Sequence, residues 1–296
     1  NVSTYIFWYC KYLKVNKGFP YGVKIEPYEI TFLGTAGGSI AVNKQLRASG
    51  GIILRAGGIQ FHLDPGPGAL LKSRDYGVNI RGNNVLLCSH NHLSHCNDMN
   101  IIIDAMTHSG IDKLGIVIGS KSVLQGREND RPYVTRKHRQ RVSKILALEP
   151  GNVVKFGNNV ELRTIKTKHS DESAVGFKIF CDKFVVGYSG DTAYFEGLVA
   201  ELRGSDILIL NVLRPFGYKD ENNLSSDDAV RIIKEVKPNL AIITHFGQKM
   251  LEQNPIYQAR EIQRLTNIQT IAARDGMSIN PNTYSVSLKH RNLQIH

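Results

Sequence analysis

The segment Val85-Leu-Leu-Cys-Ser-His-Asn-His-Leu-Ser-His-Cys-Asn-Asp98 constrains the fold and the chemistry of this chain more than any other. Its first four residues are a short, continuous apolar run, which is typical of a strand that is buried on both faces. His90, His92 and His95 follow directly, within six residues. Because α/β sheets bind their ligands at the carboxyl ends of strands, this position favours a binding site.

The spacing of these histidines indicates a metal centre. His90 and His92 lie two residues apart on an extended segment and therefore point to the same side. His95 reaches a neighbouring position if the chain turns into a helix there. Imidazole nitrogens bind zinc, iron and similar transition metals. A single histidine is more often a hydrogen-bonded core residue, but three at this spacing predict metal ligation.

Apolar runs of strand length occur on both sides of this segment. The early runs 51–55 and 59–63 flank a Gly-Gly turn, which predicts a β-hairpin. The later runs alternate with helical patterns, one of which begins at an N-cap at Ser225 and stops before Pro238. This order predicts an α/β fold of layered sheets and helices. We expect a single domain at 29–282, an N-terminal extension at 1–28 and a C-terminal tail at 283–296.

The composition excludes several classes of protein. Hydrophobic residues make up 42% and charged residues 21% of the chain, as in folded globular proteins, so disorder is not its main state. No apolar run approaches the ~18–20 residues that a membrane-spanning helix needs, so no membrane partner is expected. The four cysteines are too few and too scattered for a disulfide framework, which favours a reducing, cytoplasmic location: Cys10, Cys88, Cys96 and Cys181.

The charge balance favours an anionic partner. Lysine and arginine number 37 against 26 acidic residues, which gives a formal net charge of +11. A phosphate-bearing metabolite or nucleic acid fits this charge, and a basic solvated surface is the alternative. The same two interpretations apply to the densest basic run: Arg131, Arg136, Lys137, His138, Arg139, Arg141 and Lys144. The sequence is also compatible with a homodimer.

Five segments together resemble the metallo-β-lactamase superfamily. His90-Asn-His-Leu-Ser-His95 resembles its HxHxDH signature, and the other segments follow in the order that the superfamily has. Phe32–Gly38 resembles the amino-terminal signature of the RNase Z-like branch. The remaining three resemble the later ligand turns: Lys168-His169-Ser170, Tyr188-Ser-Gly-Asp191-Thr192 and Ile243-Thr-His245-Phe-Gly247.

This resemblance implies a four-layer αββα sandwich with a metal centre at one edge of its two sheets. One metal would be held by His90, His92 and His169, and a second by His95 and His245. Asp191 would bind both metals. The implied cofactor is Zn²⁺, one or two ions per chain, with Mn²⁺ as an alternative. The implied chemistry is hydrolysis by a metal-bound hydroxide, with Asp191 and His95 in the catalytic centre.

Ser94 departs from the signature, which has an aspartate at this position. A neutral hydroxyl is a much poorer ligand for a divalent ion than a carboxylate is, so the second metal site should be weaker. Three interpretations stay open: one tight and one weak metal with activity retained, a catalytically impaired site, or a binding protein that has lost catalysis. Cys96 and Asp98 lie near enough in sequence to substitute in part, but packing and outer hydrogen bonding are the roles expected for them.

The function expected is a phosphodiesterase that acts on RNA or on cyclic or other nucleotides. The alternatives are hydrolysis of a small acyl compound, such as a thioester or lactone, and non-catalytic nucleotide binding. The stretch 211–225 contains no histidine that could serve as the additional general acid of RNase Z, so tRNA maturation is not expected. Asp64 could orient a ligand histidine or stabilise its own turn. Arg214 could meet the substrate or form a surface ion pair.

Overall fold

The computed structural model describes residues 5–6, 28–127, 130–157 and 159–289, and these form two β-sheets that face each other. Within these ranges the first sheet has eight strands, in the order β17 (Val286–Leu288), β16 (Met277–Ile279), β2 (Glu29–Phe32), β3 (Ile52–Ala56), β4 (Ile59–Leu63), β5 (Asn83–Cys88), β6 (Ile116–Ser120) and β7 (Lys144–Leu148).

The second sheet has nine strands in the described part of the chain. Their order is β1 (Tyr5–Ile6), β8 (Val153–Phe156), β9 (Val160–Lys166), β10 (Val175–Phe180), β11 (Val185–Tyr188), β12 (Ile207–Arg214), β14 (Leu240–Thr244) and β15 (Thr270–Ala272), with β13 (Leu224–Ser225) paired to β12.

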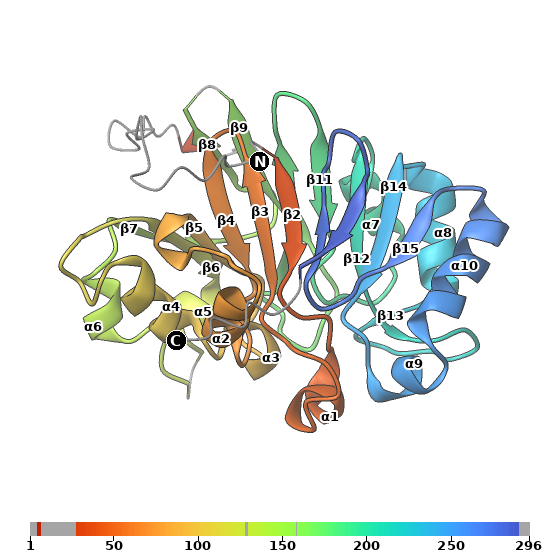
Figure 1. The fold of residues 1–296 in the computed structure, drawn as a ribbon, viewed down its shortest axis with the longest axis horizontal. Coiled ribbons are helices and arrows are strands. Elements are labelled where there is room, and N and C mark those ends of the chain that lie inside the picture. The colour runs from red at the N-terminus through yellow and green to blue at the C-terminus, as the bar shows by residue number, and fades with distance from the viewer. Residues whose placement is uncertain (1–4, 7–27, 128–129, 158, 290–296) are drawn as a thin grey trace.

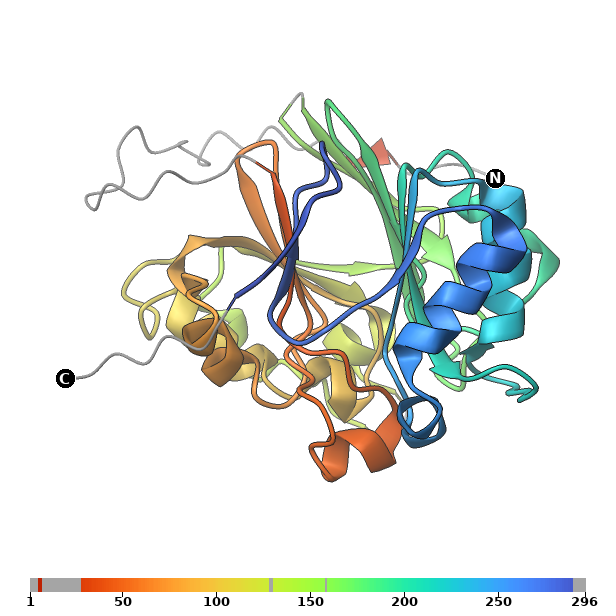
Figure 2. The same ribbon diagram turned by 45° about the vertical axis from the view of Figure 1, so that its right-hand side comes forward.

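Helices cover the outer face of each sheet (Figures 1 and 2). The first sheet carries α2 (Ala69–Asp75), η1 (Ile80–Gly82), α4 (Met99–Met106), α5 (Lys121–Gln125) and α6 (Arg136–Arg139). The second sheet carries α7 (Glu196–Leu202), α8 (Ser226–Val236) and α10 (Pro255–Thr266). The four-layer αββα sandwich predicted from the sequence is confirmed.

Hydrophobic side chains hold these layers together. The inner faces of both sheets share one core, in which the Phe61 and Phe156 rings meet edge to face at 5.5 Å. A second core lies between the nine-stranded sheet and its helices, and a third between the eight-stranded sheet and its helices. Continuous apolar strands such as β5 are therefore buried on both faces, as their sequence predicts.

Local sequence signals account for several elements. β3 and β4 pair antiparallel around Gly57 and Gly58, whose positive φ angles of 57° and 76° suit glycine. At the start of α8, Ser225 and Asp228 form a capping box, as the N-cap pattern predicts. β17, which lies in the segment expected to be a tail, pairs antiparallel with β16. Across the described ranges, no helix is both long and apolar enough to cross a membrane.

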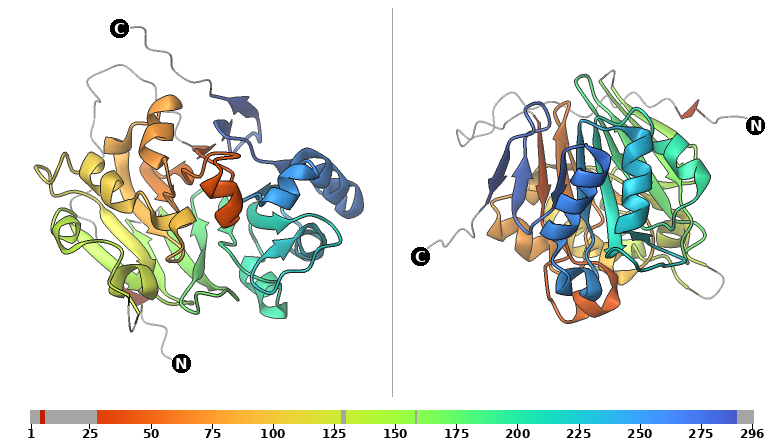
Figure 3. Two further views of the ribbon diagram at one scale, coloured as in Figure 1. Left: turned by 90° about the horizontal axis from the view of Figure 1, so that it is seen from below. Right: turned by 90° about the vertical axis from the view of Figure 1, so that its right-hand side faces the viewer.

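Three short helices follow carboxyl ends of strands and lie along one edge of the sandwich. They are α1 (Gly38–Asn43) after β2, α3 (Leu93–Cys96) after β5, and α9 (Gln248–Glu252) after β14. This edge is the lower one in Figure 1, and the view from below in Figure 3 shows α1 between the two halves of the molecule. The histidine-rich segment therefore reaches an edge to which both sheets contribute.

His62, the residue before the last one of β4, is fully buried and is not one of the potential metal ligands. Its Nε2 donates to the Gly50 carbonyl at 2.9 Å, which leaves Nδ1 without a partner among the described residues. Burial lowers the pKa of His62 to about 4. The unfolded chain therefore takes up a proton below about pH 6.5, where the folded chain does not.

We predict that His62→Gln flattens the acid limb of the stability curve. A depressed histidine pKa removes stability as the pH falls from about 6.5 to about 4, by up to about 3 kcal/mol. Glutamine keeps a donor for Gly50 but does not titrate. Urea unfolding of both proteins between pH 7.5 and pH 4.5 measures how the free energy of unfolding depends on pH. If this free energy falls equally in the wild type and the variant, His62 is not the cause of the loss.

Candidate metal centre

Six potential ligands converge at the edge where α1, α3 and α9 lie. Four of them follow the carboxyl ends of strands: His90 and His92 follow β5, Asp191 follows β11, and His245 follows β14. His95 lies in α3, and His169 lies in the loop between β9 and β10. Each sheet therefore supplies three of the six side chains.

His90, His92 and His169 form the first group of ligand atoms. The Nε2 of His90 lies 3.0 Å from the Nδ1 of His92, and the Nε2 of His169 lies 3.2 Å from that same Nδ1. His90 is buried, His169 is half-buried and His92 is exposed, so this group opens to solvent.

His95, His245 and Asp191 form the second group. The Nε2 atoms of His95 and His245 lie 3.0 Å apart, and the Oδ2 of Asp191 lies 3.3 Å and 3.4 Å from them. The same Oδ2 lies 3.8 Å from the Nε2 of His90. Asp191 therefore faces both groups.

Hydrogen bonds on the far side of three rings orient their Nε2 atoms toward the centre. The Nδ1 of His95 donates to Asp64 at 2.9 Å, that of His90 to the Ser89 hydroxyl at 2.9 Å, and that of His169 to the Asn222 carbonyl at 2.7 Å. In a neutral ring that donates through Nδ1, the other nitrogen, Nε2, carries a lone pair. Lone pairs that face one another at this distance repel unless a cation lies between them.

The distances and the donor types fit a metal ion. A tetrahedral metal with ligand atoms at about 2.0–2.1 Å places those atoms roughly 3.3 Å apart. The separations between ligand atoms within the second group, 3.0 to 3.4 Å, match this value. Nitrogen and carboxylate ligands suit Zn²⁺ and also Mn²⁺.

The pKa values also indicate a need for positive charge. Burial lowers the pKa of His90 well below its ordinary value and that of His245 to about 4, so both rings are neutral. Burial opposes ionisation of Asp191, but His245 and His95 hold its pKa well below the usual range. Burial would lower the pKa of His95, but Asp191 and Asp64 raise it to about 10. The two carboxylates beside His95 therefore require a cation there, either a proton or a metal.

Asp64 accepts hydrogen bonds from three segments. Besides His95, its carboxylate accepts from the backbone amide of Ser89 at 2.7 Å, the Ser89 hydroxyl at 2.8 Å and the Tyr188 hydroxyl at 2.6 Å. The backbone of Asp64 has a positive φ of 50° in its Asp-Pro-Gly turn. Of the two roles considered from the sequence, these contacts support orientation of a ligand histidine.

Sequence reasoning gave Asn211 no role, but its amide supports Asp191. The Nδ2 of Asn211 donates to the Oδ1 of Asp191 at 2.7 Å and to the Tyr188 hydroxyl at 3.1 Å. The other carboxylate oxygen, Oδ2, is therefore the one that faces the histidines. The available signal was a single polar residue within the apolar run of β12.

Ser94 lines a small cavity of about 30 Å³ together with His95, His245 and Asn211. Asp64 also lines this cavity, but Asp98, the acidic residue that lies near Ser94 in the sequence, does not. The oxygens of Asp98 accept instead from the Leu70 backbone amide at 3.4 Å and from the Asn97 side chain at 3.0 Å. Cys96 is buried in the core, as expected.

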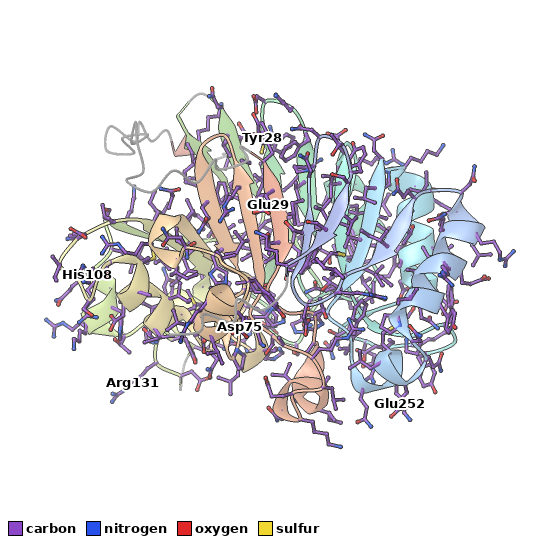
Figure 4. All side chains as sticks on the ribbon, in the orientation of Figure 1. Tyr28, Glu29, Asp75, His108, Arg131 and Glu252 are labelled. Atoms are coloured by element: carbon purple, nitrogen blue, oxygen red, sulfur yellow. The ribbon has the colours of Figure 1, made fainter. Side chains whose placement is uncertain are left out.

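Several of the basic residues considered for substrate binding make contacts within the protein. Arg214 pairs with Asp220 at 2.9 Å, which supports the surface ion pair. His138 and Arg141 of the basic run both pair with Asp104. Arg131 is exposed, and Figure 4 shows it at the outer margin of the helices over the eight-stranded sheet. Part of this run is therefore structural, and part is solvated.

Comparison with known proteins agrees with this geometry. Residues 60–246 match the family model of the beta-lactamase superfamily domain. The chain belongs to the metallo-β-lactamase superfamily. A superfamily relative, described as the uncharacterized protein MJ1374 of Methanocaldococcus jannaschii, is 32% identical over 253 residues, which are 85% of this chain and 94% of the relative.

Solved structures share the fold of this superfamily member. YhfI from Bacillus subtilis, a metallo-beta-lactamase fold protein, has a TM-score of 0.71 at 20% identity, over 86% of this chain and 99% of YhfI. The short form of human tRNase Z has a TM-score of 0.63 at 14% identity, over 85% and 98% of the two chains. A diphosphatase of the PhnP family has a TM-score of 0.61 at 16% identity, over 89% and 100%. The fold is that of metal-dependent hydrolases.

Gly37 is a second feature that the sequence analysis did not assign to the site. A Cβ atom at this position would lie 2.4 Å from the Nδ1 of His245 and 2.3 Å from its backbone oxygen. His245 itself has a positive φ of 63°. Only glycine therefore lets the turn after β2 approach this histidine so closely.

We predict that Gly37→Ala weakens metal binding by roughly 10- to 100-fold, the scale of losses when a ligand loses its support. The added methyl group must displace His245 from its position beside His95. Titration of Zn²⁺ against a chromophoric chelator measures the affinity. Gly82→Ala is the matched control, because its Cβ would make only ordinary contacts at 3.6 Å with Gln60. Equal Zn²⁺ affinity in both variants would contradict the prediction.

Proposed function

We propose that this chain is a phosphodiesterase that uses a two-metal centre. The observation that carries the proposal is the position of Asp191, whose Oδ2 faces His90 on one side and His95 and His245 on the other. A carboxylate in that position can bind two metals at once. His90, His92 and His169 would hold the first metal, and His95, His245 and Asp191 the second.

The metals, when bound, would lower the pKa of a coordinated water and polarise the scissile group, which suits in-line displacement at phosphorus. The chain's own residues keep the ligands in place. Asp64 fixes the orientation of His95, and Asn211 turns the free oxygen of Asp191 toward the histidines. We propose Zn²⁺ as the native metal, with Mn²⁺ as the alternative, because most of the ligands are imidazole nitrogens.

A phosphate-containing substrate, a nucleotide or RNA, has two kinds of support. The formal net charge of +11 favours an anionic substrate. Two proteins of the same fold, human tRNase Z and a PhnP-family diphosphatase, are named for action on tRNA and on a diphosphate. A substrate of this class is therefore preferred over a thioester or lactone.

We predict that the purified protein hydrolyses bis-p-nitrophenyl phosphate faster than p-nitrophenyl acetate when Zn²⁺ or Mn²⁺ is present. Chelation should abolish the reaction, and added metal should restore it, because the centre supplies the nucleophile. Release of p-nitrophenolate measures both rates. Turnover of the acyl ester alone would favour the acyl hydrolase, and nucleotide binding that survives chelation without any turnover would favour a non-catalytic binder.

We predict that Ser94→Asp strengthens the second metal site. The second group has a single carboxylate, Asp191, and Asp98 bonds elsewhere, so an added carboxylate at position 94 supplies a missing charged ligand. Metal content should rise from about one to about two ions per chain, and activity by ~10–100-fold. Elemental analysis and the phosphodiester assay measure the two effects.

Ser94→Asn is the matched control, since it has nearly the same shape as aspartate without the charge. It should leave the metal content at the wild-type value. If Ser94→Asp changes neither metal content nor rate, Ser94 is an adaptation of this site rather than an impairment.

A further inference from the structure

Asp171 is a buried carboxylate outside the six ligands. It lies in the loop between β9 and β10, two residues after His169, and is 2% exposed. One oxygen accepts from the backbone amide of Asn91 at 3.2 Å and from the Ser122 hydroxyl. The other accepts from the backbone amide and the hydroxyl of Ser173, at 3.0 Å and 2.9 Å, and from the Arg127 guanidinium.

These contacts connect the two segments that carry the first ligand group. Asn91 stands between His90 and His92, so its amide is part of the loop that presents both rings. His169 is in the same loop as Asp171 itself. Ser122 belongs to α5, which the apolar core holds in place. One carboxylate therefore ties both ligand-bearing loops to a fixed helix of the eight-stranded sheet.

Packing restricts the ligand side chains of the first group less than those of the second group. His95, His245 and Asp191 are buried, so packing restricts their positions. His92 is exposed and His169 is half-buried, so neighbouring side chains restrict them less. The positions of their loops then depend on backbone hydrogen bonds such as the one from Asn91 to Asp171.

We propose that Asp171 is a positioning residue for the first metal site. It would set the distance between the Nδ1 of His92 and the Nε2 of His169, which is 3.2 Å here, by fixing the loops on which both rings stand. Asp64 plays the corresponding part for His95 in the second group. The inference rests on the proposed metal centre and adds a residue that the ligand motifs do not contain.

Asp171→Asn tests this inference, because it keeps the shape of the side chain and removes one acceptor. The new NH₂ group must face donors, so at least one of the loop contacts is lost. Zn²⁺ is titrated into the metal-free full chain in competition with a chromophoric chelator. We expect the tight Zn²⁺ of the wild type to bind at least about 10-fold more weakly in the variant, the scale for a lost supporting partner.

Asp206→Asn is the matched control. Asp206 also anchors a loop, since it accepts from the Val185 backbone amide at 2.8 Å, but it lies at the amino ends of β11 and β12, away from the centre. This variant tests whether any loss of a loop anchor weakens Zn²⁺ binding. It should bind Zn²⁺ as the wild type does, whereas an equal loss in both variants would overturn the positioning role.

Ser122→Ala provides a milder second variant if Asp171→Asn does not fold. It removes one of the hydrogen bonds to Asp171 and should weaken Zn²⁺ binding in the same direction by a smaller factor. Wild-type affinity in Asp171→Asn, or in Ser122→Ala where the first variant is unfolded, overturns the inference. Failure of the wild type to bind Zn²⁺ at all would instead overturn the proposed metal centre.

Discussion

The hydrogen bonding of the Asp64 carboxylate is the constraint on which the rest of the centre depends. Its donors come from Ser89 at the end of β5, from His95 in α3 and from Tyr188 at the end of β11. The carboxylate thus joins the two sheets at the edge where their ligands meet. Ser89 continues this network to His90, and Tyr188 continues it through Asn211 toward Asp191. Because a buried carboxylate must keep its hydrogen-bond donors, this network restricts the relative positions of the side chains in the centre.

The sequence was sufficient for the fold, and the candidate ligands that it indicated lie close together in the structure. Continuous apolar runs, the Gly-Gly hairpin and the capping box at Ser225 are local signals, and each formed the element that was predicted. The histidines also gave a local signal, because the alternation of an extended segment places His90 and His92 on the same side. The resemblance to the superfamily then identified His169, Asp191 and His245, which the structure brings within reach of them.

The supporting residues could not be predicted, because their roles arise from contacts between distant parts of the chain. Asp171 is 80 positions from Asn91, and Asn211 is 20 positions from Asp191. Gly37 matters only because the turn after β14 approaches it in space. A short polar residue or a glycine has the same local appearance in an ordinary loop. Only the packing of the two sheets shows which of these residues support the centre and which are ordinary loop residues.

The division of the ligands between the sheets has a consequence for folding. His92 and His169 are separated by 77 positions, and His95 and His245 by 150. A metal held by both members of such a pair would join segments that are very far apart in the sequence, and the unfolded chain brings such segments together only at an entropic cost. Such a metal would bind the folded chain far better than the unfolded chain, so metal affinity and folding free energy would be linked and free metal would raise the melting temperature.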